Sequence, residues 1–157
     1  MIERSRKIIK NHKPVYPYLE RVVPSHFAIL NAIMWGAPTS SFDCPLYKEY
    51  PPRWPKMVRI VTESALVGEL GPVQVESAKW WPAGRYAWVK GGKMHNSIFY
   101  TDTGFSGEVM TYEQAVKEFE GKTMGVNAFI EPPPREIFNA STARQRQGGL
   151  NIIDMTP

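Results

Sequence analysis

The chain has 157 residues, of which 43% are hydrophobic and 22% charged, an ordinary composition for one globular domain. Its single cysteine, Cys44, excludes an internal disulfide, and we expect neither a secretory signal peptide nor a membrane span, because no long apolar run is present. The formal charge of +4 lies in residues 1–13, while acidic and basic side chains balance over the rest of the chain.

The first 24 residues are predicted to form a basic arm and a connector. Residues 14–24, PVYPYLERVVP, carry three prolines and two tyrosines, which is typical of extended chain. The next stretch, SHFAILNAIMWG, has a good N-cap in Ser25, a helix-closing Gly36 and almost no polar face between them. A helix that is apolar all round is buried, so we expect the single domain, residues 25–130, to begin with a buried helix.

From Met57 the hydrophobic period changes to two. The runs MVRIV, PVQVESA, RYAWVK, NSIFYT and GEVM predict five short strands separated by Gly or Pro signals. Short strands in close succession favour a small antiparallel sheet or an open barrel. The stretch MVRIVTESALVGELGPVQVE, with Gly68 and Gly71, loosely resembles the small SH3-like modules of ribosomal proteins, and that resemblance implies an SH3-like barrel.

One capped helix, from Thr111 to Glu120, is predicted after these strands. Thr111 and Gln114 have the spacing of a capping box, and Tyr112, Val116 and Phe119 then follow on one apolar stripe that we expect to pack on the sheet. MGVNAFI is consistent with a sixth strand. EPPP at 131–134 is expected to end the regular structure, leaving residues 131–157 as an extended C-terminal tail. The fold class is therefore α+β with extended terminal arms.

A predicted hairpin carries the candidate binding residues. A type I′ turn at Gly91-Gly92 would place Lys90 opposite Lys93 and Trp88 opposite His95. Its basic tip either binds phosphate or is simply solvated. Cations beside flat side chains are what single-stranded nucleic acid requires. The candidate contacts for a nucleic acid or another anion are Arg4, Arg6, Lys7, Lys10, Arg85, Tyr86, Trp88, Lys90 and Lys93.

No catalytic motif is present. The three histidines are widely separated, and neither the phosphate-binding G-x-x-x-x-G-K-[ST] nor a dinucleotide fingerprint occurs. We therefore expect no enzymatic activity, no metal and no cofactor. The leading hypothesis is a structural assembly subunit that contacts other protein subunits of a larger complex, such as a bacteriophage virion. The alternative is a module that binds DNA or RNA. Both hypotheses place the chain in the cytoplasm or within a large particle.

Overall fold

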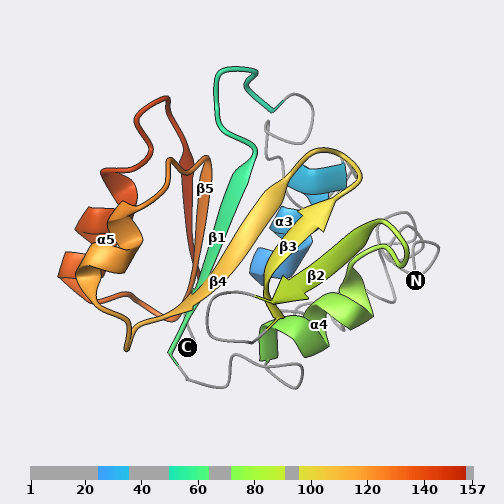
Figure 1. Ribbon diagram of the computed structural model, residues 1–157, viewed down its shortest axis with the longest axis horizontal. Helices are drawn as coiled ribbons and strands as arrows, with labels where there is room; N and C mark the ends of the chain where they lie inside the picture. The colour runs from blue at the N-terminus through green and yellow to red at the C-terminus, as the bar shows by residue number, and fades with distance from the viewer. Residues whose placement is uncertain (1–24, 36–49, 64–71, 91–95, 155–157) are drawn as a thin grey trace.

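The computed structural model describes residues 25–35, 50–63, 72–90 and 96–154 (Figure 1). The elements within these ranges follow in the order α3 (Ser25–Trp35), β1 (Met57–Thr62), α4 (Pro72–Trp80), β2 (Tyr86–Lys90), β3 (Asn96–Thr101), β4 (Ser106–Thr111), η2 (Val116–Glu120), β5 (Val126–Ile130), α5 (Arg135–Thr142) and β6 (Leu150–Asp154). None of the helices in these ranges has the length and hydropathy needed to cross a membrane.

Six strands of the described chain form one mixed sheet in the order β2-β3-β4-β1-β5-β6. The four strands β4, β1, β5 and β6 are parallel, whereas β2 and β3 form an antiparallel ribbon joined to the β4 edge. The predicted mixture of helices and a sheet is confirmed. The predicted antiparallel order is wrong for the parallel half, and the sheet is open and does not close into a barrel.

Helices cover both faces of this sheet, as Figure 1 shows with α5 on one side and α3 and α4 on the other. On one face, Phe27 and Leu30 of α3 and Val73 of α4 pack with Val58 and Ile60 of β1. On the other face the second core cluster joins η2 and α5 to the sheet through Val61, Met110, Phe119, Phe129, Ile137 and Ala140. The parallel half of the molecule therefore has the layered arrangement of α/β proteins.

The central strands explain why this half is parallel. In β1 every residue after Met57 is buried, and in β5 all but the last residue are buried, so neither strand has a solvent face. Strands buried on both sides are typical of parallel sheets between helical layers. Only Arg59 and Asn127 interrupt the two apolar runs, and both are fully buried.

Two predictions about which residues form helices need correction. PVQVESA is not a strand, because residues 72–80 form α4, where the buried Val73, Ser77 and Trp80 recur at helical spacing. The helix predicted from Thr111 to Glu120 is also wrong in extent, because β4 continues to Thr111 and only a short 3₁₀ helix, η2, follows. Half of the capping box nevertheless forms, since the Gln114 amide oxygen accepts from the Thr111 backbone N–H at 2.8 Å.

The predicted C-terminal tail is wrong over most of its length. Residues 135–142 form α5, and β6 pairs in parallel with β5 along five residues from Leu150 to Asp154. The prolines at 132–134 therefore connect a strand to a helix instead of ending the structure. The basic N-terminal arm, residues 1–24, lies outside the described residues, whereas the predicted burial of α3 is confirmed by Phe27, Leu30 and Met34.

Candidate functional site

The chain leaves two neighbouring parallel strands toward opposite faces of the sheet. The first described helix after β1 is α4, which packs on the α3 face, whereas α5 follows β5 and packs on the other face. The space outside the carboxyl ends of β1 and β5 is therefore a topological switch point. Open α/β sheets bind their ligands at such points. This makes the carboxyl edge of the parallel strands the candidate functional site.

Polar side chains occupy this edge on each of the four parallel strands. Glu63 directly follows β1, Tyr112 follows β4, Glu131 follows β5, and Asp154 ends β6. Backbone bonds join neighbouring strand ends: the Tyr112 N–H donates to the Thr62 carbonyl at 3.1 Å, and the Glu131 N–H donates to the Asp154 carbonyl at 2.8 Å. We call the set of Glu63, Tyr112, Glu131 and Asp154 the carboxyl-edge site.

Glu131 has an unusual backbone conformation. It is the only non-glycine residue with a positive φ, of 68°, among the described residues. A non-glycine residue in this left-handed region costs about 1–3 kcal/mol and persists only where its surroundings hold it there. Residues under such strain are enriched at functional sites, so the conformation of Glu131 is a second feature that favours this edge as the site.

Tyr112 is the side chain that contacts this strained residue. Its hydroxyl lies 2.7 Å from the Glu131 carbonyl oxygen and 3.1 Å from the Ile130 carbonyl oxygen. Burial raises the pKa of Tyr112, and the negative charges of Glu63 and Glu131 raise it further. The hydroxyl therefore keeps its proton and serves as a donor.

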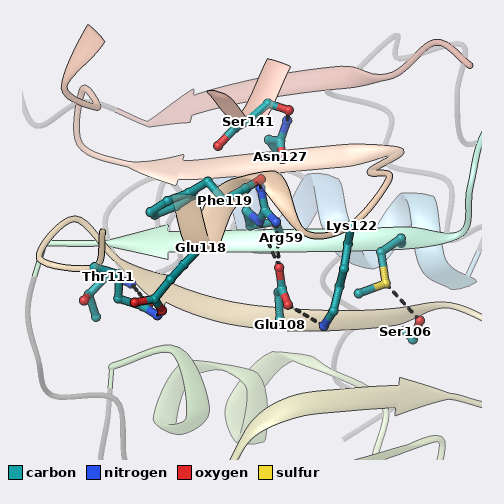
Figure 2. A network of polar contacts seen from close by, with 11 residues as sticks. Arg59, Ser106, Glu108, Thr111, Glu118, Phe119, Lys122, Asn127 and Ser141 are labelled. Carbon is teal, nitrogen blue, oxygen red and sulfur yellow. Dashed lines mark hydrogen bonds and ion pairs between the residues drawn. The ribbon is translucent and has the colours of Figure 1, made fainter. Parts of the chain in front are cut away.

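A separate polar row crosses the sheet beneath η2 and α5 (Figure 2). The strand register aligns Glu108, Arg59, Asn127 and Asn151 on four successive strands. Glu108 accepts from Arg59 at 2.8 and 3.0 Å and from Lys122 at 2.6 Å. Asn127 donates to Asn151 at 3.0 Å.

Arg59 anchors this row to the layer above the sheet. Its guanidinium donates to the Phe119 carbonyl at 2.9 Å and lies 5.3 Å from the centre of the Phe119 ring. Burial lowers the pKa of Arg59, and the Glu108 carboxylate opposes that shift. Since Arg59 has no exposed side-chain surface, we interpret the row as structural.

The predicted nucleic-acid contacts are placed as follows. Tyr86 and Trp88 are half-buried, because their rings face Trp81, on which Trp88 is stacked with an interplanar angle of 8°. Arg85 forms an ion pair with Asp102 at 2.6 Å, and Lys90 is exposed. Lys93 and the N-terminal candidates Arg4, Arg6, Lys7 and Lys10 lie outside the described residues. Binding of nucleic acid by these residues remains a prediction.

The register of the hairpin also differs from the prediction. Trp88 pairs with Phe99 and Lys90 with Asn96, with a register shift between Val89 and Lys90. A two-residue turn at Gly91-Gly92 would have paired Trp88 with His95, so the predicted strand register is wrong. Residues 91–95 themselves lie outside the described residues.

Sequence reasoning missed the carboxyl-edge site. Its four side chains lie up to about ninety residues apart in the sequence and meet only because the parallel strands end at one edge. A usable signal existed in VNAFIE, where a carboxylate directly follows an apolar run that only Asn127 interrupts. Comparison of the chain with protein-family models, curated proteins and solved structures gave no match.

Proposed function

We propose that this chain is a subunit of a larger assembly that binds a phosphate-bearing ligand, such as a nucleotide, together with a divalent cation at the carboxyl-edge site. The single observation that carries the proposal is that α4, the first described helix after β1, and α5, which follows β5, pack on opposite faces of the sheet. This arrangement places a topological switch point beside Glu131. The function is one of binding, and no catalytic step is included in the proposal.

The class of ligand follows from the charges at this edge. Only four residues separate the end of β5 from the start of α5, so the positive end of its dipole and its free N–H groups lie near Glu131. Such helix ends favour phosphate groups. The carboxylates of Glu63, Glu131 and Asp154 would repel a bare phosphate, and a divalent cation removes that repulsion.

Magnesium suits this arrangement better than a cation that takes all of its ligands from the protein. The described residues contain no group of three or more His, Cys, Asp or Glu side chains that could hold a metal by itself. Magnesium commonly uses one or two protein carboxylates and completes its coordination with phosphate oxygens and water. Glu63, which directly follows β1, and Glu131, which directly follows β5, are the carboxylates we assign to this role.

The proposed assembly role comes from the sequence. It continues the interpretation of the chain as a structural subunit, such as a component of a bacteriophage virion, with other protein subunits as partners. Nucleic-acid binding is retained as the second candidate, because Lys90 is exposed at the end of β2. The two candidates predict binding at different surfaces: the carboxyl-edge site for the phosphate-bearing ligand, and the end of β2 for nucleic acid.

Calorimetric titration of the full-length chain with magnesium ATP tests the proposal. Glu131→Gln is expected to weaken binding by about tenfold or more, because an interaction with a charged group contributes about 1.5–3 kcal/mol. The matched control is Glu120→Gln, which neutralises an exposed carboxylate on η2 and should bind as the wild type does. The proposal fails if the wild type shows no magnesium-dependent binding, or if both variants bind equally well.

A further inference from the structure

We propose that one face of the β2–β3 ribbon is the interface at which a second copy of this chain binds. We call this surface the ribbon face and define it by four side chains, Ala87, Val89, Ile98 and Tyr100. The inference rests on the assembly role in the proposed function, for which it names the partner, and it involves no residue of the carboxyl-edge site.

Strand alternation assigns the four side chains of the ribbon face to one side of the sheet. Trp88 and Phe99, which lie between them in the sequence, pack into the core cluster that contains residues of α3 and α4. Successive side chains of a strand point to opposite faces, so the four side chains point away from that core. The strand register places the two members on β2 directly beside the two on β3, which makes them one continuous patch.

The described helices leave most of this patch exposed. On the same side of the sheet, η2 and α5 pack over the parallel strands through Phe119 and Ile137. In Figure 1, α5 lies beside β5 and β1, whereas β2 and β3 lie at the other end of the sheet. Tyr100 is 53% exposed and Val89 is 38% exposed. Apolar side chains that are grouped on an open sheet face mark an interaction surface.

The charges beside the ribbon face favour a second copy over nucleic acid. Glu108, on the next strand, pairs with Lys122 at 2.6 Å, and Arg85 pairs with Asp102 at 2.6 Å where β2 begins and β3 ends. Lys90 is the only cation within β2 and β3, which is too few for a surface that binds phosphates. Each ion pair has no net charge, so two identical faces can meet without repulsion, as a twofold interface requires.

The shape of the ribbon face also suits a copy of itself. The small Ala87 lies directly beside the large Tyr100, so a protruding ring adjoins a low point of the surface. A twofold axis through the patch places the Tyr100 ring of each copy over Ala87 of the other, and side chains of sheets packed face to face interdigitate in this way. The patch is smaller than the about 20–30 residues a side of a standard interface, so association is expected to be weak and to depend on concentration.

Sedimentation equilibrium of the full-length chain over a wide range of concentrations tests the interface, and we expect a reversible dimer. Val89→Glu should weaken the dimer by about tenfold or more, because the interface would bury a carboxylate without a partner. The matched control is Val75→Glu, which makes the same change at a valine of α4 that is 37% exposed, and it should associate as the wild type does. Equal weakening by both variants would overturn the assignment of the face.

A second measurement uses the wild type alone, so it does not depend on the folding of a variant. In a mixture of isotope-labelled and unlabelled chains, nuclear Overhauser effects between copies should join the Tyr100 ring to the Ala87 methyl group. A chain that stays monomeric, or contacts between copies elsewhere, would overturn the proposal. A monomer whose Tyr100 amide shifts when a single-stranded oligonucleotide is added would assign the face to nucleic acid instead.

The ligand proposal can fail separately from this one. Val89→Glu should bind magnesium ATP as the wild type does, because the ribbon face shares no residue with the carboxyl-edge site. If neither protein binds magnesium ATP, the proposed ligand is wrong, and a dimer that Val89→Glu weakens still establishes the ribbon face as the interface.

Discussion

Arg59 is the residue on which the central layer depends most directly. Its charge is fully buried between Glu108 on the neighbouring strand and the carbonyl and ring of Phe119 on η2. A buried cation with good partners adds little net stability compared with an apolar side chain of similar size. It does, however, penalise any arrangement that leaves the cation unpaired. The pair therefore favours the observed register of β1 and β4.

Removing one member of this pair should cost far more than replacing both. Glu108→Ala leaves the Arg59 charge buried and is expected to lower the free energy of unfolding by about 3 kcal/mol or more. The double change Arg59→Met and Glu108→Leu should recover most of that loss, because no buried charge remains. Urea denaturation of the three proteins measures both effects.

Lys122 provides the internal control for this comparison. Its ammonium group also binds Glu108, but about half of its side chain is exposed. Exposed ion pairs contribute about 0–1 kcal/mol, so Lys122→Ala should change stability by no more than that. Equal losses for Glu108→Ala and Lys122→Ala would show that burial of Arg59 does not have the effect assigned to it.

Among the elements, the joint between β3 and β4 contains a glycine at which there is no room for a side chain. Gly107 sits opposite Phe99 in this antiparallel pair, and a Cβ atom at Gly107 would lie 2.1 Å from the Phe99 ring and 2.8 Å from the Val58 carbonyl oxygen. Gly107→Ala should therefore displace Phe99 from the core and lower stability by about 1–3 kcal/mol.

Gly121→Ala is the matched change, because a Cβ there would meet nothing closer than 3.9 Å. Thermal unfolding of both variants should show a clear loss only for Gly107→Ala. A melting temperature unchanged by Gly107→Ala would mean that the ribbon of β2 and β3 adapts without cost.

The elements also show how far sequence patterns reach. The buried α3 was predicted because its apolar run leaves almost no polar face, and β1 was predicted because its residues follow a period of two; both patterns are local signals. The sixth predicted strand, MGVNAFI, contains β5. α4 was mistaken for a strand because Val73 and Val75 alternate with polar residues, although Pro72 at its first position is typical of a helix start. β6 was missed because five residues, LNIID, become a strand only through pairing with β5, which lies about twenty residues away.

Local sequence patterns could not predict the candidate site, for the same reason. Glu63, Tyr112, Glu131 and Asp154 are each unremarkable within their own segments. Their proximity follows from parallel pairing, and the sequence had instead predicted an antiparallel sheet, in which neighbouring strands end at opposite edges. Once the parallel direction is known, the position of the site follows from the strand ends.

At the scale of the whole molecule, an α/β half and a β-ribbon half share one sheet. The parallel strands with helices on both faces provide the carboxyl edge, and the ribbon of β2 and β3 extends the sheet beyond β4 (Figure 1). The carboxyl-edge site belongs to the first half, and the predicted hairpin contacts belong to the second. Ligand binding at one half or the other therefore distinguishes the two proposed functions.

The most direct test of the central claim is a map of backbone amide chemical shifts in the full-length chain during titration with magnesium ATP. If the ligand binds at the carboxyl-edge site, the largest changes fall at Glu63, Tyr112, Glu131 and Asp154, the ends of the four parallel strands, and they disappear when magnesium is removed. Changes confined to the β2–β3 ribbon around Lys90, or no saturable change anywhere, would contradict the assignment of the site.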